Sequence, residues 1–110
     1  MFSRELKKGS TELMILSLLE AGPRHGYDIG KRIEHRSRGK LQLRVALLYP
    51  MLCRLESRGL IRGRWVERAG ERRRRYYRLT DEGKRMLARE RETWREFMTA
   101  VNRVVGGRHA

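Results

Sequence analysis

Four consecutive arginines, Arg72–Arg75, stand directly before two tyrosines in this chain of 110 residues. A charged side chain is almost never fully buried without a partner, so the arginine end of this stretch must lie in water. Alternating segments on either side of Gly70 predict a β-hairpin of roughly residues 61–67 and 73–79. The chain must therefore fold with a charged hairpin that projects from its body.

Strand alternation divides the second half of this hairpin into two faces. One face carries Arg73, Arg75, Tyr77 and Leu79, and the other carries Arg72, Arg74, Tyr76 and Arg78. We expect Tyr77 and Leu79 to pack inward with Trp65 at the base. The arginines near the tip are free to meet phosphate, and Tyr76 on the outer face can still donate a hydrogen bond to one.

Positive charge is concentrated in the middle of the chain. The formal net charge is +14, and residues 36–78 hold 14 basic and 3 acidic side chains. A charge needed only for solubility would not have to cluster in this way. The excess favours a polyanionic partner, with nucleic acid ahead of an anionic membrane surface. The alternative is a solvated arginine face without a partner.

Three helices are predicted before the hairpin. The first follows Ser10, a candidate N-cap, and its run Leu13–Leu19 is apolar on most sides. The second covers roughly residues 27–36, with a narrow stripe made by Tyr27, Ile29 and Ile33. The third should begin near residues 44–46, so that Pro50 falls close to its first turn, and should end before Gly59.

A long helix is predicted after the hairpin, with Thr80 as its N-cap and Gly106 and Gly107 at its end. About 25 residues span roughly 38 Å, too long to pack fully on so small a domain. Its apolar stripe should therefore pack against a second subunit. The stripe consists of Leu87, Trp94, Phe97, Met98, Val101, Val104 and Val105.

Three helices followed by a β-hairpin is the order of a winged helix-turn-helix, an α+β fold that is mostly α. In such domains the third helix enters the DNA major groove, and the hairpin, or wing, lies along the backbone or in the minor groove. We expect a DNA-binding domain over residues 1–79, and a dimerisation helix with a short tail over residues 80–110.

Four stretches are similar to the PadR family of bacterial transcriptional regulators. They are KGSTELMILSLL, HGYDIGKRIE, LLYPMLCRLESRGLI and RRRRYYRLTDEGKRML, and the resemblance covers about residues 6–90. A single C-terminal helix is typical of the short subfamily. The resemblance implies a dimeric repressor of a palindromic operator, and some members are released by small molecules held near the dimer interface.

The chain departs from the family pattern immediately before Leu48-Tyr49-Pro50. Family members usually carry a glycine and then a threonine or serine there, whereas this chain has Val45-Ala46-Leu47. A hydroxyl that would contact a phosphate or a base edge is therefore missing. Either apolar contact with a thymine methyl group replaces it, or Leu47 belongs to the core.

Ten residues are candidates for DNA contact. They are Lys40, Arg44, Ala46, Tyr49, Arg54, Arg72, Arg73, Arg74, Arg75 and Tyr76. Tyr49 could donate to a phosphate or pack between helices, and Arg44 is better placed than Arg54. Trp94 with Met98 could hold a flat aromatic or drug-like effector between two subunits. The alternative is that Trp94 only fills a closed dimer seam.

Other classes of protein are disfavoured. We find no phosphate-binding loop, no nucleophile with a base and no paired carboxylates, so we expect no enzyme and no cofactor. The three histidines lack metal-ligand spacing. No segment is apolar enough to span a bilayer, and the single cysteine, Cys53, expected to be half-buried, suggests a reducing compartment, the cytoplasm.

Charge alone does not separate DNA from RNA. An RNA-binding or ribosome-associated protein is one alternative, although aromatic residues are only 7% of the chain and RNA binders use exposed aromatics for stacking. A nonspecific architectural DNA-binding protein is another.

Overall fold

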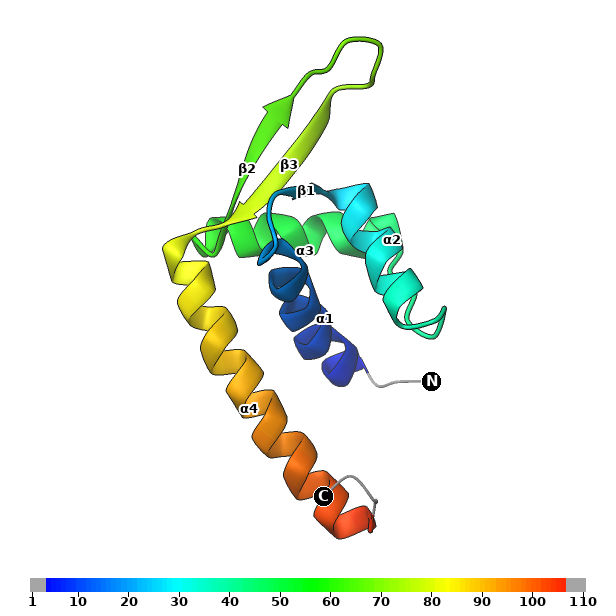
Figure 1. Cartoon of the computed structure of the whole chain (residues 1–110), viewed down its shortest axis with the longest axis vertical. Coiled ribbons are helices and arrows are strands. Elements are labelled where there is room, and N and C mark those ends of the chain that lie inside the picture. Colours follow the sequence, from blue (N-terminus) through cyan, green and yellow to red (C-terminus); the bar gives the residue numbers. More distant parts are fainter. Residues whose placement is uncertain (1–3, 107–110) are drawn as a thin grey trace.

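The computed structural model describes residues 4–106 as four helices and a small sheet. The elements are α1 (Arg4–Leu19), β1 (Arg24–His25), α2 (Gly26–Arg36), α3 (Val45–Ser57), β2 (Ile61–Val66), β3 (Arg74–Leu79) and α4 (Asp81–Val105). Figure 1 shows β2 and β3 projecting beyond the helices at one end and α4 running away from them at the other. The predicted α+β class, mostly α, is confirmed, as is the order of a winged helix-turn-helix.

The first helix begins earlier than the sequence analysis placed it. α1 starts at Arg4, so Ser10 lies inside the helix and is not its N-cap. Most residues that precede Ser10 are good helix formers, and a single glycine such as Gly9 costs a helix only about 1 kcal/mol. Later in α1, Ile15, Leu16 and Leu19 are buried, as expected of a central helix.

The third helix confirms the predicted boundaries. Arg44 is the N-cap of α3, Arg58 is its C-cap, and Gly59 follows with a φ of +76°. Pro50 lies inside the helix, beyond its first turn. Both Pro50 and Ala46 are exposed, so water can bond the Ala46 carbonyl that the missing Pro50 amide leaves unpaired.

Two other expectations about the helices were wrong. Cys53, predicted to be half-buried, is exposed on α3. It follows Ala46 by seven residues and therefore lies on the same outer face of the helix. Tyr27, predicted to join the apolar stripe of α2, is 55% exposed, and only Ile29 and Ile33 of that stripe are buried.

The sheet contains one strand that the sequence analysis missed. The strand order is β1-β3-β2, with both pairs antiparallel. β1 has only two residues, and Arg24 pairs with Tyr77 while His25 pairs with Tyr76. The hairpin itself agrees with the prediction, and Gly70 in its turn has a φ of +76°. β1 thus joins the segment before α2 to the edge of the wing.

The core lies where α1, α2, α3 and the base of the hairpin meet. Fully buried side chains include Ile15, Ile29, Leu48, Leu52 and Ile61. Tyr77 and Leu79 are also buried, as predicted. Leu87, assigned from sequence to the dimer stripe, is only 2% exposed because the first turns of α4 pack on this same core.

α4 begins as predicted. The Thr80 side chain accepts a hydrogen bond from the Gly83 amide at 3.0 Å, and Asp81 and Glu82 stand in the positive first turn. Gly83 has a low helix propensity, but it packs closely against the backbone of Leu60. The helix ends at Gly106, which adopts the left-handed conformation.

Replacing Gly83 with alanine is expected to destabilise the protein. An added Cβ would overlap the Leu60 carbonyl, a backbone group that cannot swing aside and already accepts the Thr80 amide at 3.1 Å. Such overpacking typically costs about 1–3 kcal/mol. Gly9→Ala is the matched control, because nothing lies near its Cβ position. In urea unfolding, Gly83→Ala should lower the free energy of unfolding, and Gly9→Ala should raise it slightly. Equal effects of the two substitutions would contradict the packing role of Gly83.

Candidate nucleic-acid interface

Five of the ten predicted DNA-contacting residues come together around one hollow of the molecule. A hollow between the helices and the wing is lined by His25, Tyr27, Tyr49, Trp65, Arg72, Arg73, Arg74 and Arg75. Tyr49 of α3 and the four wing arginines therefore share one surface. The other five lie outside this hollow: Lys40, Arg44, Ala46 and Arg54 are exposed, and Tyr76 is partly buried.

The Tyr49 ring lies against the start of α2. A Cβ added to Gly26 would come within 2.9 Å of the ring and of its hydroxyl oxygen, so only glycine leaves room for this ring position. The residue is nevertheless 41% exposed. Of the two roles considered for Tyr49, packing between helices is observed, and the exposed part of the ring still faces the hollow.

Arg75 is held by a carboxylate of α3. Its Nη2 donates to Glu56 Oε2 at 2.9 Å, and the same oxygen accepts the Gly63 amide at 2.9 Å. A Cβ at Gly63 would collide with this guanidinium, so the glycine leaves room for the Arg75 side chain to lie across β2. The guanidinium carbon is 5.7 Å from the centre of the Trp65 ring and 5.8 Å from that of Tyr77. Arg75 thereby ties the wing to α3.

Trp65 does not pack inward as predicted. Trp65 is on the same face of the hairpin as Tyr77 and Leu79. It pairs with Arg75, which is two residues closer to the tip than Tyr77, and no core covers it there. The side chain is 52% exposed. Two guanidinium groups lie near its ring instead, with that of Arg73 4.8 Å and that of Arg75 5.7 Å from the ring centre. Cation–π contacts replace hydrophobic burial at this position.

Arg72 and Arg73 are the two most available arginines of the run. Arg72 is exposed, and the Arg73 side chain is 57% exposed; besides its contact with Trp65, Arg73 has a 3.6 Å contact from Nε to the exposed Glu67. Surface ion pairs of this kind contribute little. Both guanidinium groups can therefore meet a phosphate without breaking a buried contact.

His25 and Tyr27 were missed as members of this surface. His25 caps α2 by accepting the Asp28 amide through Nδ1 at 3.2 Å, and Arg74 Nη1 lies 3.3 Å from that same nitrogen. The His25 ring stands edge-on to Tyr76. Arg74 also lies 6.0 Å from the centre of the Tyr27 ring. The sequence offered no signal for these contacts, because they depend on β1 pairing with β3.

Lowering the pH below about 6.5 is expected to destabilise the folded chain through His25. The pKa of His25 is lowered first by burial and then by the positive charge of Arg74. Asp28 raises the pKa by a smaller amount, and Arg68 lowers it slightly further. The unfolded chain therefore binds this proton first, and stability falls as the pH drops through the ordinary histidine range.

Thermal melts at pH 7.5 and pH 5.5 test this dependence. His25→Asn should show a smaller difference between the two melting temperatures, because asparagine can cap the helix without titrating. His35→Asn, at an exposed position of α2, is the matched control. An unchanged difference in His25→Asn would show that other groups cause the effect.

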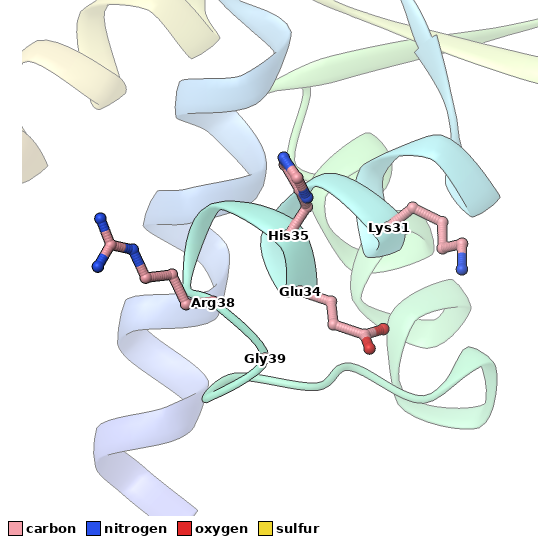
Figure 2. Close-up of a pocket in the computed structure, with 5 residues that line it drawn as sticks. All are labelled: Lys31, Glu34, His35, Arg38 and Gly39. Atoms are coloured by element: carbon pink, nitrogen blue, oxygen red, sulfur yellow. The ribbon is translucent and has the colours of Figure 1, made fainter.

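A second hollow lies on the outer side of α2 and the following loop. It is lined by Lys31, Glu34, His35, Arg38 and Gly39. In Figure 2 the four side chains point in different directions and do not converge on a common point. Nothing in this arrangement suggests a catalytic or ligand-binding centre. Within residues 4–106, no group of three or more histidine, cysteine, aspartate or glutamate side chains could hold a metal ion.

The outer half of α4 carries uncovered apolar surface. Arg91 joins α4 to α1 through Glu20 at 3.0 Å and Ser17 at 3.2 Å. Beyond it the apolar side chains lose cover: Phe97 is 52%, Val105 69% and Val104 87% exposed. Trp94, Met98 and Val101 are partly buried, and the Trp94 and Phe97 ring centres are 6.1 Å apart. Within the described part of the chain, no helix has the length and hydropathy needed to cross a bilayer.

Comparison with known proteins places this arrangement in a family. The sequence model of the transcriptional regulator PadR-like family matches residues 15–89. A transcriptional regulator from Clostridium thermocellum has a similar structure, with a TM-score of 0.84 and 32% identity over 94% of this chain and 97% of that one. A PadR family transcription regulator from Clostridium difficile gives 0.76 and 32%, over 86% and 97%. An uncharacterized protein from Lysinibacillus sphaericus is 28% identical over 107 residues, covering 97% of this chain and 98% of its own.

Proposed function

Because the chain belongs to the transcriptional regulator PadR-like family, and is thus a DNA-binding regulator of transcription, we propose that it is a sequence-specific repressor. It binds a palindromic operator as a homodimer. The observation that carries this proposal is the single surface shared by Tyr49 of α3 and the four wing arginines, in a chain with a net charge of +14. The family is one of regulators and not of enzymes.

The two parts of this surface have different tasks in the proposed complex. The exposed face of α3 enters the major groove, where base edges differ between all four base pairs. Lys40, Arg44 and Arg54 contact phosphates around that groove. On the wing, Arg72 and Arg73 contact the backbone, while Arg74 and Arg75 chiefly set the position of the wing through His25 and Glu56. Phosphate contacts fix the register, and α3 supplies the specificity.

The dimer is proposed to form through α4. Residues 1–79 then form the DNA-binding part and residues 80–110 the dimerisation part, except that Leu87 belongs to the core of its own chain. The exposed valines and Phe97 support this assignment, because a stripe of this kind is costly to leave in water. A two-fold axis would set two copies of α3 about one turn of DNA apart, roughly 34 Å. Action on DNA agrees with the expected cytoplasmic location.

A small aromatic or drug-like effector is proposed to bind between the two copies of Trp94, with Met98 at the edge. The competing account is a closed seam in which Trp94 is only the largest packing residue. An effector must bind the DNA-free and DNA-bound dimers with different affinities in order to release the operator.

Tryptophan fluorescence should reveal such an effector. Titration with planar hydrophobic cations and phenols is expected to quench the wild-type signal, and Trp94→Phe, which keeps Trp65, should lose that quenching. Quenching that persists in Trp94→Phe would place the ligand elsewhere. If no compound quenches the wild type, the closed seam is the better account.

Selection from a pool of random DNA duplexes tests the proposed function as a whole. Purified protein at about 150 mM salt should enrich an inverted repeat, since a two-fold symmetric dimer selects a two-fold symmetric site. A footprint should then protect both half-sites. Enrichment without a common sequence would favour the architectural alternative, and stronger retention of structured RNA than of any duplex would favour the RNA-binding alternative.

A further inference from the structure

The exposed face of α3 is unusually apolar for the most basic part of the chain. Val45 is 59% and Leu47 is 61% exposed, so Leu47 is not part of the core. Ala46, Pro50 and Cys53 are exposed as well. Over the first nine residues of the helix, the only exposed side chains that can form a hydrogen bond are the Tyr49 hydroxyl and the weakly bonding Cys53 thiol.

The helical repeat arranges these residues in a strip. At 3.6 residues per turn, Ala46, Pro50 and Cys53 follow one line along the helix. Val45 and Tyr49 flank that line on the side of Glu56, which holds the wing through Gly63 and Arg75. Leu47 and Arg54 flank it on the other side. The small Ala46 side chain at the start of the line lets the helix approach a surface closely, with a larger apolar group on either side.

The surroundings of the strip indicate what covers it. Arg44 stands at its beginning, Arg54 near its end, and the wing arginines share a hollow with Tyr49 beside it. A second copy of the chain would place arginines against arginines. A DNA duplex satisfies both features, because its phosphates match the arginines and its major groove contains one kind of apolar group on the base edges, the 5-methyl group of thymine.

We propose that the beginning of α3 recognises thymine methyl groups, with Val45, Ala46 and Leu47 as the specificity-determining residues. This inference rests on the proposed function, since it requires an operator. Each half-site then contains at least one thymine whose methyl group contacts Val45 or Leu47 in the major groove. Hydrogen bonding to base edges is secondary at these positions.

Replacing single thymines of the selected operator with deoxyuridine tests the proposal directly. This change removes the methyl group and leaves base pairing and every hydrogen-bonding group in place. Affinity should fall about fourfold for one methyl group, and about 16-fold when both half-sites are changed, the effect of losing one buried methyl group at each site. Replacing such a thymine by cytosine should weaken binding, and 5-methylcytosine there should recover part of the loss.

Variants locate the contact on the protein. In Leu47→Ala or Val45→Ala the deoxyuridine penalty should shrink at the thymine that the side chain touches, as measured by a double-mutant cycle. Both side chains are exposed, so these variants should fold. Tyr49→Phe is the control; it keeps Val45 and Leu47 and should therefore keep the penalty.

The possible failures of this experiment can be told apart. If the wild type binds a selected operator but loses less than about 1.5-fold at every deoxyuridine, far below the worth of one methyl group, the methyl-group inference is overturned and the proposed function stands. A penalty that is unchanged in both alanine variants also overturns it. If no operator can be selected at all, the proposed function itself fails.

Discussion

Replacing Arg72 and Arg73 together with alanine is expected to weaken binding to every DNA duplex by the same factor. Within the run Arg72–Arg75 these are the two exposed arginines, and in the proposed complex each neutralises one phosphate. The proposed dimer would lose four such contacts, two from each chain, so the slope of log affinity against log salt should fall by about 3.6. If the affinities converge near 1 M salt, that change in slope corresponds to a loss on the order of 10³-fold at 0.15 M.

The matched control for this variant removes the same charge from a different place. Arg85 and Arg95 lie on α4, where each is paired with a glutamate three residues earlier. The Arg85→Ala, Arg95→Ala double variant should leave the slope almost unchanged. Equal slopes for the two double variants would show that the arginine run is a solvated face and that the proposed role of the wing is wrong.

Arg75 should behave differently from its neighbours. Because Glu56 holds its guanidinium at 2.9 Å, Arg75→Ala is expected to loosen the wing as well as remove a charge. Glu56→Gln keeps the shape of the partner but weakens the same link. The two variants should therefore share a loss of DNA affinity, although their effects on net charge are opposite.

Placing aspartates at Val101 and Val104 is expected to convert the proposed dimer into monomers. At about 1.5 kcal/mol for each buried valine, the low end of the usual range, four valines across a two-fold axis contribute about 6 kcal/mol. Their loss alone would weaken dimerisation about 10⁴-fold. DNA affinity should fall with it, because a monomer can occupy only one half-site.

Sedimentation and circular dichroism distinguish this result from unfolding. The double variant should sediment as a monomer while it keeps its helical spectrum. Thr99→Asp, an exposed position on the opposite side of α4, should remain dimeric. A Val101→Asp, Val104→Asp protein that still sediments as a dimer would show that α4 is not the interface.

Local signals in the sequence predicted most of the fold. Thr80 predicted the start of α4, Gly59 the end of α3 and Gly70 the hairpin turn. A helix N-cap, a helix C-terminus and a tight turn each favour particular residue types for local backbone reasons. The alternation of the second strand likewise placed Tyr77 and Leu79 inward. These features depend on residues close together in the chain, so they could be identified without a structure.

The errors concern features that only the assembled fold determines. Trp65 lies on the predicted face, but how far the core reaches along the hairpin depends on where α3 crosses it. Helix propensity alone makes Gly83 unfavourable in α4, and its packing against the Leu60 carbonyl depends on the tertiary fold. The strand β1 has two residues and no pattern of its own. It brings His25 to Tyr76 and Arg74, and so completes a surface of which the sequence revealed only the arginines.

The central claim is that two copies of this chain recognise one symmetric DNA sequence. Equilibrium binding to the selected inverted repeat and to a scrambled duplex of the same composition, at about 150 mM salt, tests it most directly. We expect two chains per duplex and an affinity for the repeat at least about 10³-fold above that for the scrambled DNA. Equal affinity for the two duplexes, or saturation by a single chain, would contradict it.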